Sequence, residues 1–207
     1  MDIVGGTNDW KQVYAVCLGF VNPRPIALVS TISANGSYNL APFSFYNMVC
    51  ANPPVVMFST GLKRDGTPKD TFVNVEATRE FVVATVTDDF RQQMVDSAAL
   101  LPYGESEFDF SGLTPAPATR VRPPLVREAK VNIECRLRQT IVIGDGPGSA
   151  RIVLGDVLCI HVAEEILDAE RRIDPRKLPT VGRLGGQWYC TVTDPYELHI
   201  PQPDRRS

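Results

Sequence analysis

Polar side chains are set into an otherwise apolar stretch, NPRPIALVSTISANGSYNLAPFSFYN, between residues 22 and 47. Their hydroxyl and amide groups belong to Ser30, Thr31, Asn39, Ser44 and Asn47. Such groups can donate hydrogen bonds to a ligand that carries many acceptors. The alternative is that they bond to one another and to the neighbouring backbone. The residue types alone favour the two interpretations about equally.

A second group of residues indicates an anion site. Thr67-Pro68-Lys69-Asp70 is typical of a helix start, with Thr67 as the cap, Pro68 at the first helical position and an acidic residue three positions after the cap. The N–H groups at a helix start are unpaired, and the helix dipole is positive there. With an ammonium beside them, Lys69, Asp70 and Thr71 suit a phosphate. Most helix starts bind only water, so this pattern alone is weak evidence.

Several other chemistries are disfavoured. The chain has two histidines, His161 and His199, and no serine in a G-x-S-x-G turn, so a catalytic triad is not expected. The same shortage of ligands argues against a metal site. GDGPGS lacks the spacing of a phosphate loop, and RLGG falls short of a dinucleotide fingerprint.

The cysteines are predicted to be structural. There are five, at wide spacings, with no C-x-x-C pair and no histidine placed for a zinc set. Cys135 and Cys159 lie in alternating apolar stretches, where a free cysteine behaves as a small hydrophobic residue. We therefore expect buried thiols without a redox role.

Composition restricts the class of protein and its partners. A chain of 207 residues with 43% hydrophobic and 22% charged residues suits one globular domain, residues 1–207, with a frayed tail at 200–207. The net charge is −3 and no long run of Lys or Arg occurs, so nucleic acid is not expected as a partner. The acidic N-terminus and the absence of an 18-residue apolar run predict a cytoplasmic protein without a membrane segment.

Two hairpins and short helices are expected to position these residues. A strand over 25–32, the Asn35-Gly36 turn and a returning strand from Tyr38 form the first hairpin, because both turn residues accept positive φ. Pro53-Pro54 precedes a buried strand over 55–59. The helix that begins at Thr67 should run to about Thr78, followed by a strand over 80–87 and a helix capped by Asp88-Asp89 that ends near Ala99.

The second half predicts another hairpin. Residues 101–124 read as an irregular surface excursion, and 130–143 alternate so that Asn132, Glu134, Arg136 and Arg138 form a wet face. The turn GDGPGS joins this strand to another over 151–162, and a short helical candidate follows at 174–178. Because strands recur as hairpins and helices are isolated, we expect an antiparallel sheet closed into a barrel.

The ordered motifs resemble the flavin reductase-like, FMN-binding split-barrel family, which includes the flavoredoxins. The most specific match is R-P-I-A-x-V-S-T-x-x-x-x-G-x-x-N-L-A-P-F-S-F-Y-N, from Arg24 to Asn47. Weaker matches follow in the same order along the chain: K-D-T-x-x-N at 69–74, E-F-x-x-x-G-L-T-P at 107–115, I-E-C at 133–135, L-G-D-V at 154–157 and R-L-G-G-x-x-Y at 183–189.

This resemblance implies a mainly β fold, a Greek-key split barrel with a few peripheral helices. It also implies a homodimer, with FMN near the subunit interface and NADH or NADPH as reductant. Carried onto this chain, the resemblance predicts that the FMN-binding residues are Ser30 and Thr31 at the ring edge, Ser44, Phe45, Tyr46 and Asn47 in a loop at the ring and ribityl chain, Lys69, Asp70 and Thr71 at the phosphate, and Arg183 and Tyr189 in the flavin surroundings. Asn39 joins this set from the hairpin. The hairpin then supplies walls and small donors, and the helix start supplies the anion site.

The expected activity is hydride transfer from NADH or NADPH to FMN, with a monooxygenase or another electron acceptor as partner. No side chain is expected to act as acid or base, because the flavin carries the chemistry. Amide groups near Ser30 and Thr31 would stabilise charge on the flavin. Three alternatives stay open: an FMN-bound electron carrier without rapid nicotinamide turnover, an oxidase of a pyridoxine-type phosphate, and a β interaction module without cofactor.

Overall fold

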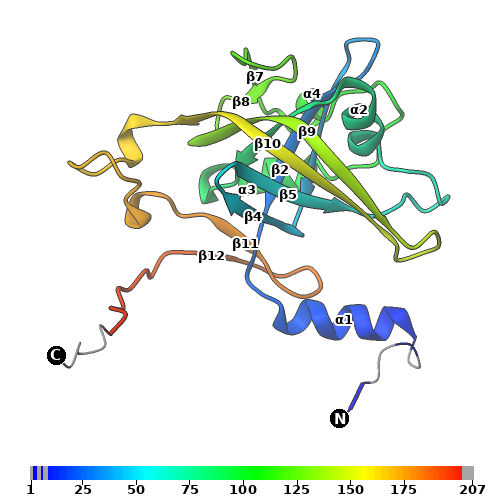
Figure 1. Ribbon diagram of the computed structural model, residues 1–207, viewed down its shortest axis with the longest axis horizontal. Helices are drawn as coiled ribbons and strands as arrows, with labels where there is room; N and C mark the ends of the chain where they lie inside the picture. Colours follow the sequence, from blue (N-terminus) through cyan, green and yellow to red (C-terminus); the bar gives the residue numbers. More distant parts are fainter. Residues whose placement is uncertain (1, 4–5, 7–8, 202–207) are drawn as a thin grey trace.

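A seven-stranded antiparallel sheet forms the body of the protein (Figure 1). The computed structural model describes residues 2–3, 6 and 9–201. The strand order is β3-β2-β6-β9-β10-β5-β4. The bounds are β2 Ala27–Ile32, β3 Tyr38–Phe43, β4 Tyr46–Ala51, β5 Pro54–Thr60, β6 Glu80–Thr85, β9 Val131–Ile143 and β10 Ala150–Val162.

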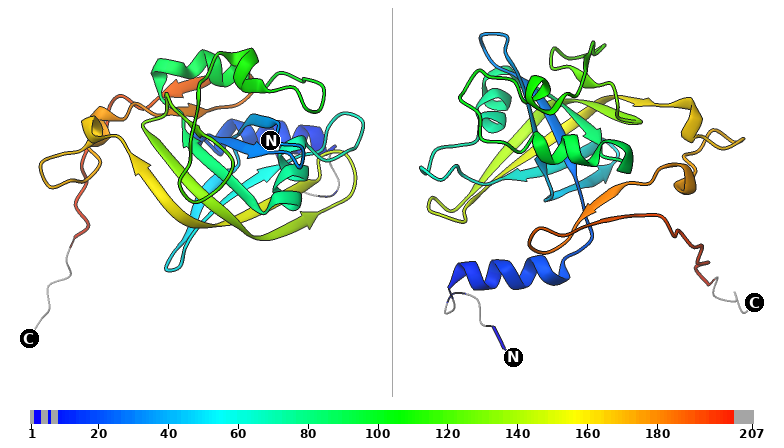
Figure 2. Two further views of the ribbon diagram at one scale, coloured as in Figure 1. Left: turned by 90° about the horizontal axis from the view of Figure 1, so that it is seen from above. Right: turned by 180° about the vertical axis from the view of Figure 1, so that it is seen from behind.

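The two edges of this sheet are joined by a very short link. The edge strands β3 and β4 are consecutive in the chain, and only Ser44 and Phe45 lie between them. The sheet must therefore curl until its edges approach, although among the described residues β3 pairs only with β2 and β4 only with β5. Figure 2 shows the curled strands from above. The expected mainly β fold, a split barrel, is confirmed.

The first hairpin closes as predicted, with a different turn. β2 and β3 pair from Ala27↔Phe43 to Ile32↔Tyr38. Gly36 has a φ of +89°, whereas Asn35 is not among the residues with positive φ. The Gly36 amide donates to the Ser33 carbonyl and the Ser33 amide to the Ser37 carbonyl, so the loop is longer than a two-residue turn. A single left-handed residue is enough for such a loop, and glycine adopts that conformation without strain.

Aromatic side chains fill the interior of the barrel. The ring centroids of Phe43 and Phe58 are 5.2 Å apart, and those of Phe58 and Phe81 are 5.4 Å apart. Phe81 fits because β10 carries glycine at the position that faces it: a Cβ on Gly155 would lie 2.3 Å from Phe81 Cζ. The packing of Phe81 in the barrel interior thus depends on the absence of a side chain at Gly155.

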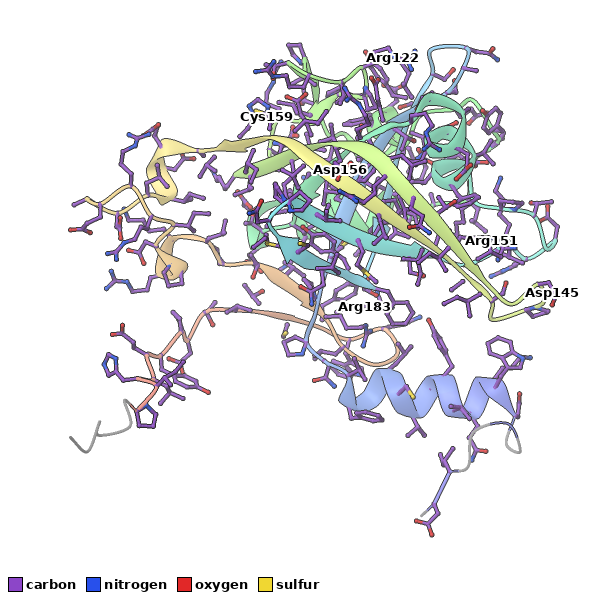
Figure 3. All side chains as sticks on the ribbon, in the orientation of Figure 1. Arg122, Asp145, Arg151, Asp156, Cys159 and Arg183 are labelled. Carbon is purple, nitrogen blue, oxygen red and sulfur yellow. The ribbon has the colours of Figure 1, made fainter. Side chains whose placement is uncertain are left out.

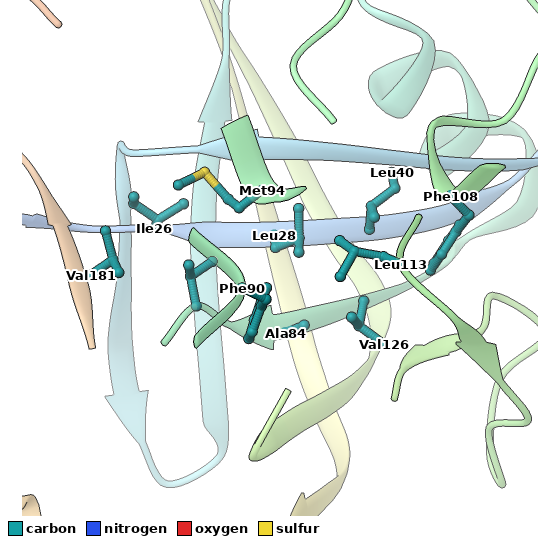
Figure 4. Close-up of a cluster of buried hydrophobic side chains, with 11 residues drawn as sticks. Ile26, Leu28, Leu40, Ala84, Phe90, Met94, Phe108, Leu113, Val126 and Val181 are labelled. Carbon is teal, nitrogen blue, oxygen red and sulfur yellow. The ribbon is translucent and has the colours of Figure 1, made fainter. Parts of the chain in front are cut away.

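A second core covers the outer face of β2 and β6 (Figure 4). Its helices are η1 Asp88–Phe90, α3 Arg91–Asp96 and α4 Glu107–Ser111. Phe90, Met94, Phe108 and Leu113 are buried there against Leu28. The prediction that 101–124 is a surface excursion was wrong in this part, because Phe108 and Leu113 belong to the core.

The predicted wet face of β9 is covered over half of its length. Asn132 and Glu134 are buried, whereas Arg136 and Arg138 are exposed. The segment that carries the short strands β7 Pro115–Ala116 and β8 Leu125–Val126 lies over this face, and the Asn132 side chain bonds both the amide and the carbonyl of Val126. Alternation along a strand shows which residues share a face and not what covers that face.

Helix α2, Asp70–Thr78, begins later than the sequence predicts. Asp65 accepts hydrogen bonds from the Thr67 amide and hydroxyl, and Pro68 forms an isolated bridge with Leu62. Thr67 therefore belongs to the preceding loop and cannot cap the helix. The cap position is Lys69, whose side chain makes no capping bond.

Helix α1, Trp10–Phe20, was not predicted and lies beside the barrel body (Figures 1 and 2). No residue of α1 is buried. The small sheet of β1 Arg24–Pro25, β11 Val181–Arg183 and β12 Tyr189–Thr191 holds its C-terminal end, because the Arg24 guanidinium donates to the carbonyls of Leu18, Val21 and Leu184.

The remaining elements are short. The chain has 3₁₀ turns at η2 Glu164–Ile166 and η3 Pro175–Lys177, the second within the predicted helical candidate. No helix in the described part of the chain is long and apolar enough to cross a membrane. The predicted frayed tail, 200–207, lies outside the described residues from 202 onward.

Candidate functional site

Two adjoining cavities of about 530 and 540 Å³ open beside the link between β3 and β4. They share Pro42, Phe43, Leu62, Lys63 and Arg64 in their walls, and we call the two together the groove. The first cavity is the ring-side lobe and the second the helix-side lobe. The groove therefore has an apolar middle and two cations on the shared wall.

The helix-side lobe contains the start of α2. Lys69, Asp70 and Thr71 line it together with Asn39, as the sequence predicts for an anion site. The side-chain amide of Asn39 donates to Thr71 Oγ1 at 3.0 Å, and Lys63 Nζ donates to Asp70 Oδ1 at 2.5 Å. Asp70 thus neutralises Lys63, whereas no ion pair joins Lys69 or Arg64 to an acid among the described residues. Two cations and the first amides of α2 remain for an anion.

Glu107 is a member of this lobe that the sequence analysis did not select. Its carboxylate accepts a hydrogen bond from the Leu40 amide at 2.8 Å, and burial raises the pKa of the Glu107 carboxyl. The residue begins one of the quoted motifs, E-F-x-x-x-G-L-T-P, so a signal existed. What the sequence could not show is that α4 turns this carboxyl toward the start of α2.

The ring-side lobe is lined by aromatic residues from two elements. Phe45 comes from the link after β3, and Trp10 and Tyr14 come from α1. Tyr14 meets Phe45 edge-on with ring centroids 6.3 Å apart, and Trp10 lies 6.5 Å from Tyr14. The Trp10 ring rests on Gly148, where an added Cβ would lie 2.8 Å from Trp10 Cε3. Ser44, a predicted site residue, lines the same lobe.

Comparison with known proteins identifies the family. A model of the flavin reductase like domain matches residues 20–177. The chain belongs to the flavin reductase-like family. An uncharacterized protein of Aquifex aeolicus (strain VF5) is 40% identical over 200 residues, which cover 97% of this chain and 100% of that protein.

Two solved structures of the family are close in fold and sequence. Nitrilotriacetate monooxygenase component B from Bacillus cereus is 33% identical with a TM-score of 0.90, covering 96% of this chain and 98% of that chain. Pseudomonas fluorescens 2-nitrobenzoate 2-nitroreductase NbaA is 30% identical with a TM-score of 0.86, covering 97% of this chain and 96% of that chain. Membership in this family indicates that the protein is a flavin-dependent oxidoreductase.

The predicted loop residues Tyr46 and Asn47 lie in strand β4 in this family member. Tyr46 packs partly buried against the interior core, and burial raises the pKa of its hydroxyl to about 12. Asn47 is exposed, and its side-chain oxygen accepts from the Met48 amide at 2.8 Å. Only Ser44 and Phe45 of the predicted loop form a link between strands, and those two line the groove.

Ser30 and Thr31 are fully buried and do not line the groove. Thr31 Oγ1 accepts a hydrogen bond from the side-chain amide of Asn74 at 3.0 Å, and the Tyr103 hydroxyl donates to Asn74 Oδ1. Ser30 Oγ is buried without a hydrogen-bond partner in the structure. Thr31 and Asn39 thus each have a hydrogen-bond partner on α2, as the interpretation of bonds within the protein describes. A flavin contact by Ser30 or Thr31 stays a prediction.

Arg183 and Tyr189 lie at a different cavity, of about 760 Å³, between α3 and the β11–β12 hairpin. Arg183 donates to the Tyr189 hydroxyl and to the Gly186 carbonyl, and its guanidinium carbon lies 4.3 Å from the centre of the Tyr189 ring. Burial and the neighbouring Arg24 lower the pKa of Arg183. This cavity shares Ala98 with the helix-side lobe, but neither Arg183 nor Tyr189 lines the groove, so within one chain this pair lies apart from the other predicted residues that do line it.

The groove fits a flavin mononucleotide by its chemistry. Phe43, Phe45 and Leu62 provide walls for a flat ring, and Thr60 Oγ1, a buried hydroxyl without a partner, belongs to a residue of the same lobe. The cations and the start of α2 suit a phosphate at the other end. An apolar pocket with a few placed polar groups is the usual form of a cofactor site.

Proposed function

We propose that this protein binds FMN in the groove and uses NADH or NADPH as the hydride donor, as a flavin reductase. The observation that carries the proposal is the polarity of the groove: aromatic and aliphatic walls at one end, and the start of α2 with Lys69 and Arg64 at the other. Bound FMN would supply the hydride-accepting ring system. The residues of the chain bind, orient and shield it.

In this proposal the helix-side lobe holds the phosphate. Lys69 and the amides of Asp70 and Thr71 would donate to it, and Asn39 would keep the Thr71 hydroxyl in place. Arg64, on the wall between the lobes, adds a second cation. The Lys63–Asp70 pair fixes the loop before α2 against the first turn of the helix.

The ring-side lobe holds the ring system. Phe45 and Phe43 would contact its faces, while Tyr14 and Trp10 exclude water from the outer side. Ser44 lies at the turn where the backbone leaves β3, and its hydroxyl and that of Thr60 are small groups of this lobe that could donate to the ring. No side chain in this lobe needs to act as an acid or base for hydride transfer.

We also propose a homodimer, as the family resemblance implies. Apolar side chains are exposed on three elements: Phe20 of α1 is 68% exposed, Met48 of β4 54% and Trp188 before β12 75%. Contiguous apolar patches mark interaction sites, and we propose that these three elements contribute to the contact between the two copies. Light scattering after gel filtration should give twice the mass of one chain. An electron acceptor such as a monooxygenase is proposed as partner, by analogy with the Bacillus cereus protein, which is a component of nitrilotriacetate monooxygenase.

The decisive experiment follows the visible spectrum of the purified protein with FMN, before and after addition of NADH or NADPH under nitrogen. Rapid bleaching of the flavin supports the reductase. Flavin retained without rapid bleaching would leave the electron-carrier alternative, and no bound flavin would contradict both.

The anion site is tested separately with Lys69→Ala. Loss of one charge-assisted contact, worth about 1.5 to 3 kcal/mol, should weaken FMN binding by roughly 10- to 150-fold while riboflavin binding changes little. Lys177→Ala is a matched control, because Lys177 lies in η3 and does not line the groove. Equal loss for FMN and riboflavin would remove Lys69 from the phosphate site.

A further inference from the structure

A carboxylate, a thiol and an imidazole meet on the outer face of β9 and β10. A ligand atom from each of Glu134, Cys159 and His161 lies within 4.8 Å of the other two. Glu134 is the register partner of Cys159, and His161 follows two residues later on β10. Residues two apart on a strand point to the same side, so the hairpin itself brings the three groups together.

This cluster is separate from the groove. None of its three residues lines the groove, and the Gly146 to Ala150 end of the hairpin that does line it is at the opposite end of β10. Figure 3 labels Cys159 and Asp145 toward these two ends. A ligand in the cluster would therefore not compete with a ligand in the groove.

The Glu134 carboxylate is already held in position. It is fully buried and accepts hydrogen bonds from the Thr119 amide at 2.9 Å, the Thr119 hydroxyl at 2.7 Å, the Arg120 amide at 2.5 Å and the Val121 amide at 3.0 Å. His161 Nε2 adds a fifth contact at 2.6 Å. Metal-ligating carboxylates are themselves hydrogen-bonded in this way, which fixes their orientation before the ion arrives.

The other two groups are reachable from solvent. The His161 side chain is 31% exposed, and Cys159 is half-buried with a free thiol. The sequence analysis expected Cys159 to be an inert hydrophobic residue and found no histidine placed for a zinc set. The register of the hairpin changes that expectation, because the ligand from β9 lies 25 residues before Cys159 in the chain and directly opposite it in the sheet.

We propose that Glu134, Cys159 and His161 bind a zinc ion. One oxygen, one sulfur and one nitrogen ligand suit this borderline-soft cation, and three protein ligands leave a fourth tetrahedral position for water on the solvent side. Harder cations such as Mg²⁺ and Ca²⁺ would be disfavoured by the thiolate and the imidazole.

Binding requires a small rearrangement with a defined proton balance. Tetrahedral ligands at zinc distances of about 2.0 to 2.3 Å lie roughly 3.3 Å apart, so the 2.6 Å His161–Glu134 contact must open by less than about 1 Å. The His161 side chain is partly exposed, so its ring can rotate by this amount. Zinc then takes the place of the shared hydrogen, which moves to the other ring nitrogen, and the Cys159 proton is released to solvent.

The test uses the full-length protein after removal of metal with a chelator. Zinc binding is measured by competition with a chromophoric chelator, and cobalt replaces zinc for spectroscopy. We expect one ion per chain and, with cobalt, a thiolate charge-transfer band together with intense visible bands typical of a tetrahedral site. Cys159→Ser and His161→Ala should each weaken zinc binding by more than the roughly 10- to 100-fold that loss of an outer-shell partner costs.

The chain offers matched controls in the other histidine and an exposed cysteine. His199→Ala and Cys50→Ser should bind zinc as the unaltered protein does. A melting temperature that rises with zinc in the unaltered protein but not in Cys159→Ser adds a second readout, and circular dichroism verifies that each variant is folded. Zinc binding that survives in folded Cys159→Ser, or no zinc binding by the unaltered protein, would overturn the proposal and leave the cluster as a structural anchor of residues 119–121.

Discussion

Two buried glutamates show opposite electrostatic behaviour in this protein. Glu134, beneath residues 119–121, has burial working against its ionised form, yet hydrogen bonds from His161, Thr119 and Arg120 lower its pKa to about 2. Glu107, in the helix-side lobe, has its pKa raised because burial outweighs its hydrogen bonds, among them that from the Leu40 amide. Glu134 has five hydrogen-bond contacts that favour its ionised form, whereas the donors to Glu107 do not offset its burial. The Glu134 anion holds the backbone of residues 119–121 in place. The Glu107 carboxyl has its pKa shifted toward the neutral form.

The largest effect is expected from Glu134→Ala. The change removes the buried carboxylate that is the shared acceptor of the Thr119, Arg120 and Val121 amides, and a hydrogen bond to a charged group contributes about 1.5 to 3 kcal/mol. The free energy of unfolding in urea should fall by about 3 to 5 kcal/mol. Glu107→Ala, the matched change at the other glutamate, should cost clearly less. Equal losses in the two variants would contradict the contrast.

Acid unfolding provides the next test. The folded-state pKa of Glu134 lies below the unfolded value of 4.5, so its contribution to stability is present above pH 4.5 and is lost as the pH falls toward about 2. Glu134→Gln removes the titrating group, and its unfolding free energy should change less over this range than that of the unaltered protein. Urea titrations at several pH values measure this, and parallel curves would show that another acid controls the transition.

Glu107 should produce the reverse dependence. Its folded-state pKa lies above the unfolded value, so the contribution of this group is most favourable below the unfolded pKa and is lost as the pH rises through the folded pKa. Glu107→Gln keeps an acceptor for the Leu40 amide without the charge. The variant should be more stable than the unaltered protein at pH 8, by less than about 1.5 kcal/mol, and the gain should shrink toward pH 4. A gain independent of pH would exclude the charge as its cause.

The smallest expected effect concerns FMN binding and depends on the proposed function. Ionised Glu107 shares the helix-side lobe with Lys69 and Thr71, where it would repel a phosphate. Glu107→Gln should therefore tighten FMN binding at pH 8 by a few-fold, about 0.5 to 1 kcal/mol, with no gain for riboflavin. Fluorescence titration with the two flavins separates the phosphate from the ring. An equal gain for both would place the effect on packing.

Local patterns predicted most of the sheet. The Asn35-Gly36 turn, the alternation along 130–143 and the apolar runs gave hairpins that the register confirms. Family motifs extended this to the split barrel. The helix start was placed too early because Asp65 takes the Thr67 groups, a contact within the loop that a capping pattern does not contain.

The candidate site was predictable where residues close in sequence form it. Lys69, Asp70 and Thr71 line one lobe, and Ser44 and Phe45 line the other. Glu107, Trp10 and Tyr14 reach the groove by long-range packing of α4 and α1, which no spacing indicates. Glu134 shows the same limit: its strand position predicted solvent, and a segment more than ten residues away covers it.

The unpaired seam of the barrel explains where the groove can form. β3 and β4 are linked by only two residues, yet no ladder pairs the two strands in the described part of the chain. In a fully closed barrel the main-chain amides and carbonyls pair with those of neighbouring strands. An unpaired seam leaves backbone N–H and C=O groups free to bind a ligand. The order of the strands along the chain thus leaves backbone N–H and C=O groups at this seam available to bind a ligand.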